Sequence, residues 1–133
     1  MEEKKCNNKK VLVVEDEKSL ARIIEKQLEK FGCGVSVADN VEDAMREIEK
    51  GNIDAIWLDH YLLGKKNGLD LVVELKEKGG KFSQIPIFVV SNTATGDKID
   101  AYLRLGVDRY YVKAEHSLAE MIGDVEGFLA SNK

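Results

Sequence analysis

Three carboxylates at the ends of two apolar runs are the residues of this chain best placed to do chemistry. The run Ala55–Leu58 leads into Asp59, and the run Lys10–Val14 leads into Glu15 and Asp16. Such runs are typical of buried parallel strands, whose carboxyl ends carry the reactive groups of α/β proteins. If the two strands are neighbours, the three carboxylates meet, and their mutual repulsion favours a bound cation. We expect that cation to be Mg²⁺, a hard ion that takes oxygen ligands.

Two further polar side chains end later apolar runs. Ser91 ends the run 85–91, and Lys113 follows the run 109–112. A carboxylate beside Mg²⁺ can attack phosphorus, so Asp59 could form an aspartyl phosphate. Lys113 would supply positive charge and Ser91 a hydroxyl donor to the oxygens of the transferring group. The sequence lacks a Gly-rich nucleotide loop, so we do not expect ATP as the direct donor.

The elements that must position these groups alternate between strand and helix. Because short βα units with continuous apolar strands give a covered parallel sheet, the sequence predicts an α/β fold. Right-handed connections with one reversal of winding give the strand order 2-1-3-4-5, a flavodoxin-like doubly wound (βα)5 three-layer sandwich. Asn40 and Ser117 are predicted to cap helices, and Leu103 to face inward. The strands are expected over 10–14, 35–38, 53–58, 85–91 and 109–112, and the helices over 20–31, 41–50, 68–78, 97–105 and 118–129.

Composition narrows the class of protein. The chain has 133 residues and a formal net charge of −4 at pH 7, which argues against a nucleic-acid or membrane-surface binder. No apolar run is long enough to span a bilayer, and we expect a cytoplasmic location. Residues 1–9 are predicted to form a flexible tail before one domain over 10–131. Cys6 and Cys33 have no disulfide or metal spacing, so both are expected to be free thiols in a reducing cytoplasm.

Four short motifs, in order and at matching intervals, carry a resemblance to a known family. Val13–Glu17 resembles an acidic-pair motif, Leu58–Asp59 a phospho-acceptor, Val90–Ser91 a Ser/Thr position, and Tyr110–Lys113 a strand with a switch aromatic and a lysine. The chain resembles the receiver domain of bacterial and archaeal two-component response regulators. The resemblance covers nearly the whole chain, from about residue 10 to residue 129.

The resemblance implies an acceptor and a metal site. A phosphohistidine on a sensor histidine kinase or a histidine phosphotransfer protein is expected to donate its phosphoryl group to Asp59. Mg²⁺ is expected to be held by Asp16, Asp59 and the backbone carbonyl of Tyr61, with Glu15 helping through water. Such a protein is a signalling phospho-acceptor that promotes only its own phosphorylation and dephosphorylation, and we do not class it as an enzyme.

The resemblance also implies a switch. Ser91 turns toward the phosphoryl group, Tyr110 swings inward, and the face made by the fourth helix, the fifth strand and the fifth helix changes its protein partners. The chain departs from the family at Asn92, where Ala or Gly is usual, and at Ala114, where proline is usual. The loop after Asp59 also lacks its usual proline. Asn92 and Tyr61 flank the phosphoryl pocket and are expected to control the access of water.

Other functions remain open at this stage. A phosphorelay intermediate would pass the phosphoryl group on to another histidine. A haloacid-dehalogenase-like phosphatase would need a second acid, which Asp59-His60-Tyr61 lacks. A flavodoxin-like FMN carrier would need a phosphate loop where the chain has Glu15-Asp16-Glu17. A receiver that never accepts phosphate is a further alternative. No output domain follows the last predicted helix, so we expect a stand-alone switch.

His60 directly follows Asp59. Because side chains alternate along a strand, His60 is expected to point away from Asp59.

Overall fold

Five parallel strands form one sheet in the computed structural model, which describes residues 6, 8–92 and 95–131. The strand order is β2-β1-β3-β4-β5, and it confirms the predicted order. Asp59 pairs with Val90, and Ser91 with Val112, so the carboxyl ends of the strands lie at one edge of the sheet. The strands are β1 Lys10–Val14, β2 Gly34–Ala38, β3 Ala55–Asp59, β4 Ile87–Ser91 and β5 Arg109–Val112.

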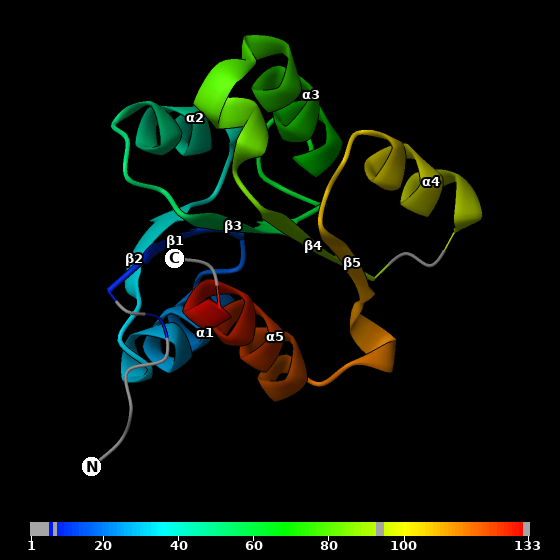
Figure 1. Ribbon diagram of the computed structural model, residues 1–133. Coiled ribbons are helices and arrows are strands. Elements are labelled where there is room, and N and C mark those ends of the chain that lie inside the picture. The colour runs from blue at the N-terminus through cyan, green and yellow to red at the C-terminus, as the bar shows by residue number, and fades with distance from the viewer. Residues whose placement is uncertain (1–5, 7, 93–94, 132–133) are drawn as a thin grey trace.

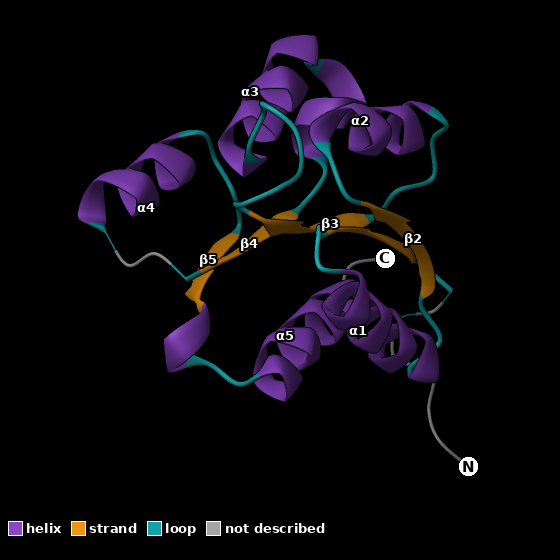
Figure 2. Cartoon of the chain, turned by 180° about the vertical axis from the view of Figure 1, so that it is seen from behind, coloured by secondary structure: helices purple, strands orange, loops and turns teal. Residues whose placement is uncertain are grey.

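Helices cover both faces of this sheet and make three layers. The helices α2, α3 and α4 lie on one face, and α1 and α5 lie on the other (Figures 1 and 2). This arrangement confirms the predicted flavodoxin-like α/β sandwich. The helices are α1 Lys18–Lys30, α2 Val41–Glu49, α3 Gly68–Lys78, α4 Gly96–Arg104 and α5 Leu118–Ser131, and two short 3-10 segments span Gly80–Gln84 and Lys113–Glu115.

The apolar core has two parts, one on each face of the sheet. Leu58 and Val89 face the layer of α2 and α3, where Tyr102 of α4 joins them. Trp57 and Phe88, one residue earlier in the same strands, face α1 and α5. All five residues are almost completely buried. Burial of a large apolar side chain contributes roughly 1.5–3 kcal/mol, so the continuous apolar strands fix the sheet between its helices.

Side-chain caps fix where several helices begin. Asn40 Oδ1 accepts a hydrogen bond from Asp43 N at 2.8 Å, and Ser117 Oγ accepts one from Glu120 N at 3.1 Å, which confirms both predicted caps. Asn67 and Asp70 form a reciprocal capping box at the start of α3. Such caps satisfy backbone N–H groups that have no partner within the helix.

Some predicted boundaries and faces were wrong. β3 and β4 begin two residues later than predicted. The 3-10 segment before β4 and Pro86, which has no N–H to donate, delay the start of that strand. On α4, Tyr102 is completely buried, but Leu103 is 50% exposed. One residue turns a helix by about 100°, so Leu103 leaves the buried side.

The two cysteines are joined, and the expectation of free thiols was wrong. Cys6 and Cys33 form a disulfide with their Cα atoms 5.0 Å apart, within the ordinary range for such a bond. The turn after α1 brings them together, because Cys6 N donates to Phe31 O at 3.1 Å and Cys33 N donates to Leu28 O at 3.1 Å. The extent of a flexible tail over residues 1–9 stays a prediction, but Cys6 within that stretch is completely buried.

Candidate functional site

Three carboxylates meet at the edge of the sheet where β1 and β3 end. One oxygen each from Glu15, Asp16 and Asp59 lies within 4.8 Å of the other two. They meet because β1 and β3 are neighbours in register, with Val14 beside Leu58. Glu15 and Asp59 are only 2% and 5% exposed. The structure therefore brings together the acidic residues that the sequence predicted for a metal site.

A lysine from the end of β5 faces these carboxylates. Lys113 Nζ lies 3.8 Å from Asp59 Oδ2 and 3.9 Å from Glu15 Oε1. Its side chain keeps a quarter of its surface exposed, so one end of the site is open to solvent. One positive charge does not balance three carboxylates, and the site as described favours a further cation.

Glu15 shows that imbalance most clearly. Burial, followed by the charge of Asp59, raises the pKa of Glu15 from 4.5 to about 8, although the backbone N–H of Glu17 and the charge of Lys113 act in the opposite direction. Oε2 accepts a hydrogen bond from Glu17 N at 3.2 Å. Oε1 is buried without a hydrogen-bond partner in the part of the chain that the structure describes. A buried carboxylate oxygen that accepts no hydrogen bond, beside two more carboxylates, fits a hard divalent cation.

The remaining predicted site residues lie in β4 and β5 or directly after them. Ser91 is completely buried at the end of β4, and the side chain of Asn92 after it is exposed. Tyr110 is partly buried against the core, with its ring centroid 5.6 Å from that of Tyr102. The Lys113–Ala114 peptide bond is trans. Ser91, Asn92 and Lys113 thus lie at the same end of the sheet as Asp59, whereas Tyr110 lies inside β5, level with Leu58.

His60 takes part in a contact that the sequence did not predict. It lies directly after Asp59, is 4% exposed, and its Nδ1 is 2.5 Å from Tyr102 Oη. Burial lowers the pKa of His60, and the charge of Lys98 lowers it further. Burial also raises the pKa of Tyr102, so a neutral imidazole and a neutral phenol share this bond. The partners are 42 residues apart, and no local pattern could have paired them.

Tyr61 follows His60 in the loop between β3 and α3, and its side chain lies on the solvent side of that loop. Its backbone N donates to Asp59 Oδ1 at 3.4 Å, and its side chain is 50% exposed. Lys98 of α4 donates to Tyr61 Oη at 3.1 Å, with Nζ 4.9 Å from the ring centroid. The Tyr61 ring also meets the His60 ring edge-on at 4.7 Å between centroids. The side chains of His60 and Tyr61 therefore both hold the loop after Asp59 to α4.

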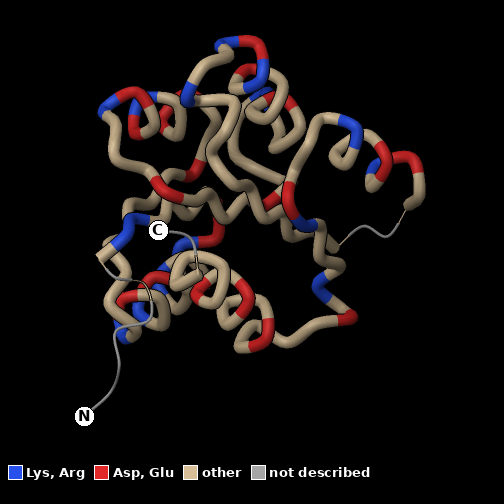
Figure 3. Tube along the Cα trace, in the orientation of Figure 1, with Lys and Arg blue, Asp and Glu red and all other residues tan. Residues whose placement is uncertain are grey.

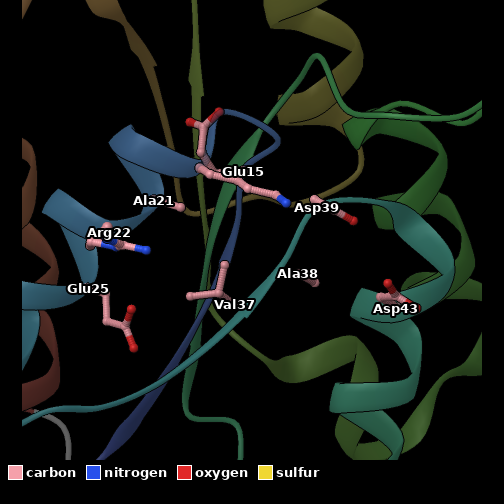
Figure 4. A pocket seen from close by; sticks show the side chains of 9 residues that line it. Glu15, Ala21, Arg22, Glu25, Val37, Ala38, Asp39 and Asp43 are labelled. Carbon is pink, nitrogen blue, oxygen red and sulfur yellow. The ribbon is translucent and has the colours of Figure 1, made fainter.

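A pocket of about 310 Å³ adjoins the carboxylates. Figure 4 shows Arg22 and Glu25 of α1 on one side, Asp39 and Asp43 across from them, and Glu15 at one end. Charges of both signs line it. Lys and Arg are likewise interspersed with Asp and Glu along α2, α3 and α4 (Figure 3). Within the described part of the chain, no helix has the length and apolar character needed to cross a membrane.

Several known proteins are similar in sequence to this chain. The chain is 34% identical over 108 residues to the alkaline phosphatase synthesis transcriptional regulatory protein PhoP of Bacillus subtilis. The aligned region covers 80% of this chain and 42% of that protein. It is 34% identical over 121 residues to the sensory transduction protein RegX3 of Mycolicibacterium smegmatis, which covers 90% of this chain and 50% of that protein. The chain thus spans about half, or less, of the length of these relatives.

Solved structures share the fold. The receiver domain of the Francisella response regulator 1452 matches with a TM-score of 0.82 and 28% identity, over 95% of this chain and 100% of that one. A CheY-like receiver domain protein from Methanospirillum hungatei matches in fold with a TM-score of 0.80 at 19% identity, over 91% of this chain and 93% of that one. The family model described as the response regulator receiver domain matches residues 11–124. This chain belongs to that family, the receiver domains of two-component response regulators.

Proposed function

We propose that the chain is a phosphorylation switch in which Asp59 is the acceptor. A carboxylate oxygen of Asp59 attacks the phosphorus of a phosphohistidine, the P–N bond breaks, and the donor imidazole leaves. The product is an acyl phosphate on Asp59. The observation that carries the proposal is the position of this buried carboxylate, with Lys113 Nζ at 3.8 Å and two further carboxylates beside it.

The acidic residues fit a divalent cation, and we propose that this cation is Mg²⁺. Asp16, Asp59 and the backbone carbonyl of Tyr61 would hold it, with Glu15 contributing through water. When bound, Mg²⁺ supplies positive charge at the oxygens of the transferring phosphoryl group. The buried Glu15 oxygen that accepts no hydrogen bond within the described residues and the raised pKa of that residue support a site of this kind.

The other residues of the edge have proposed roles around the phosphoryl group. Lys113 pairs with a phosphoryl oxygen in place of Asp59, Ser91 donates its hydroxyl, and Tyr110 changes its packing when Ser91 moves. Asn92 and Tyr61 flank the acceptor and control the access of water to phosphorus. These roles rest on the positions of the side chains at the ends of β4 and β5 and on the family to which the chain belongs.

The partners follow from this chemistry. A sensor histidine kinase or a histidine phosphotransfer protein supplies the phosphoryl group, and a downstream protein reads the face of α4, β5 and α5. We propose a cytoplasmic signalling role without direct binding to nucleic acid or membrane, and without turnover of an external substrate. The mixed charge of the helices is consistent with a protein partner (Figure 3).

Intact mass spectrometry after incubation with acetyl phosphate and Mg²⁺ tests the acceptor. We expect one added phosphoryl group on the wild-type protein and none on Asp59→Asn. Asp54→Asn is the matched control. Asp54 lies just before β3, at the amino end of the strand, and its Oδ2 accepts a hydrogen bond from Lys10 N. This control should accept phosphate as the wild type does. A stable phosphoryl group on a histidine or serine, or on Asp59→Asn, would contradict the proposal.

A further inference from the structure

The loop after the acceptor makes two side-chain contacts with α4. The inner one joins His60 Nδ1 to Tyr102 Oη at 2.5 Å, and both residues are at most 4% exposed. The outer one joins Tyr61 to Lys98, through a hydrogen bond of 3.1 Å and the stacking of the ammonium on the ring. Lys98 and Tyr102 are one helical turn apart, so both contacts fall on the same side of α4.

The inner contact is tightly enclosed. A Cβ placed on Gly68 would lie 2.8 Å from Tyr102 Oη, 3.0 Å from Asp59 O and 3.1 Å from His60 Cα. Gly68 N also donates to His60 O at 2.8 Å. The first residue of α3, the acceptor loop and α4 therefore meet at one phenol hydroxyl. In packing this close, the loop cannot shift without moving Tyr102 or breaking its bond.

The contact also extends to β5. The ring of Tyr102 packs against that of Tyr110 at 5.6 Å between centroids. A path of touching groups thus runs from Asp59 through His60 and Tyr102 to Tyr110. The path does not include the side chain of Ser91, although His60 N also donates to Val90 O of β4 at 3.3 Å. Two side chains of α4, Lys98 and Tyr102, hold this helix to the loop after Asp59.

We propose that His60 and Tyr102 are positioning residues, whose buried bond, supported by the contact of Tyr61 with Lys98, couples the acceptor loop to α4. The inference rests on the proposed acceptor role of Asp59. Changes at the acceptor are transmitted to α4 through this bond, in addition to any rearrangement of Ser91 and Tyr110. Coupling between two sites is reciprocal, so loosening α4 also changes the affinity of the acceptor site for its cation.

Tyr102→Phe tests the bond, because it removes one hydroxyl and keeps the ring. Tyr111→Phe is the matched control: Tyr111 Oη donates to Asp124 Oδ2 at 2.6 Å, on the face of the sheet covered by α1 and α5. Lys98→Met tests the outer contact, and Lys78→Met is its control, since Lys78 Nζ lies 5.7 Å from the ring centroid of Phe82, away from the acceptor.

The first measurement is amide hydrogen exchange over α4, residues 96–104, without metal. We expect Tyr102→Phe to raise exchange in α4 on the order of fivefold, the usual effect of one lost hydrogen bond, and Lys98→Met to raise it less. Both control variants should leave α4 unchanged. Wild-type exchange in α4 of Tyr102→Phe, or an equal rise in every helix, would overturn the proposal.

The second measurement is Mg²⁺ affinity, followed by the fluorescence of Trp57. We expect Tyr102→Phe to shift the dissociation constant by about twofold or more, within the usual size of coupling energies, and Tyr111→Phe to leave it unchanged. A loosened α4 with unchanged affinity would reduce the bond to a purely structural one and overturn the positioning role. Failure of the wild type to bind Mg²⁺ or accept phosphate would instead count against the proposed function, and the exchange measurement would still decide whether the bond holds α4.

Discussion

Among single residues, Glu15 shows most clearly how assembly of the site changes the protonation of a side chain. Its carboxyl is buried beside Asp59, and its pKa rises to about 8. A raised folded-state pKa means that the folded protein keeps a proton that the unfolded chain releases. At neutral pH the metal-free folded protein therefore holds Glu15 mainly in its protonated form, and a bound cation would favour the ionised form.

Glu15 should make metal-free stability depend on pH. Below 4.5, the carboxyl is protonated in both states and its contribution is fully present; as the pH rises to about 8, this contribution is lost. We expect Glu15→Gln, which cannot ionise, to gain roughly 2–4 kcal/mol relative to wild type between pH 5 and pH 8. Urea unfolding of both proteins in a chelating buffer measures this, and parallel pH profiles would contradict it.

Asp16 should matter through its negative charge. Asp16→Asn removes the negative charge of a proposed ligand and should weaken Mg²⁺ binding by at least about tenfold, since even outer partners of metal sites are worth that much. Titration followed by Trp57 fluorescence measures it, because Trp57 lies two residues before Asp59. Asp54→Asn carries the same change of charge at the other edge of the sheet and should bind as wild type. Equal affinity in Asp16→Asn would remove Asp16 from the site.

The sequence was enough to find the residues that end strands. Glu15, Asp59 and Ser91 each follow an apolar run, so the strand order alone brings them together. The bond between His60 and Tyr102 could not be predicted, because it depends on how α4 rotates and packs on the sheet. Helical periodicity does not fix that rotation, and the predicted inward position of Leu103 was wrong for the same reason.

Among the elements, α3 begins in a tightly packed space beside Asp59 and His60. Gly68→Ala would place a methyl group against Tyr102 Oη, Asp59 O and His60 Cα, at 2.8–3.1 Å. Overpacking of this kind costs about 1–3 kcal/mol, so we expect Gly68→Ala to lower the free energy of unfolding by that amount. Thermal or urea denaturation measures the change.

A helical glycine with open space around it is the control for Gly68. Among the residues that the structure describes, and apart from the adjoining backbone of its own helix, a Cβ on Gly123 of α5 would meet no atom within 4 Å. Gly123→Ala should therefore stabilise the protein by up to about 1 kcal/mol, because alanine has the higher helix propensity. Equal changes in the two variants would show that helix propensity, not the contact with the acceptor loop, governs position 68.

The element boundaries were predictable where local chemistry fixes them. The caps at Asn40 and Ser117 involve residues three positions apart, and the sequence showed both. The 3-10 segments over Gly80–Gln84 and Lys113–Glu115 were missed. Neither segment has an apolar periodicity that would predict it. Their shape is set by the elements that they connect.

For the whole molecule, the disulfide joins the N-terminal stretch to the turn after α1. Cys6 and Cys33 are separated by 27 residues, a spacing with no local signature, so only the folded chain shows the pair. We expect reduction to lower the free energy of unfolding by about 3–4 kcal/mol, from the loop entropy that the bond removes from the unfolded chain.

Urea unfolding with and without a thiol reductant measures this difference. The control is the double variant Cys6→Ser/Cys33→Ser, whose stability should not respond to reductant. Identical unfolding of the wild type in both buffers would show that the bridge does not contribute. In a reducing compartment the pair would be held as thiols, and the protein would keep the lower stability there.

The place of each strand in the sheet has a consequence for how the domain can move. β3, which carries Asp59, is hydrogen-bonded to a strand on either side, whereas β5 has β4 as its one strand neighbour in the sheet that the structure describes. Local opening is cheapest where few hydrogen bonds and little buried surface are lost. β5, like β2 at the other side of the sheet, is therefore easier to open locally than β3, so Tyr110 lies in a strand that can open while the strand of Asp59 stays paired. The outermost strand β5 can therefore open and close while the central strands of the sheet stay folded.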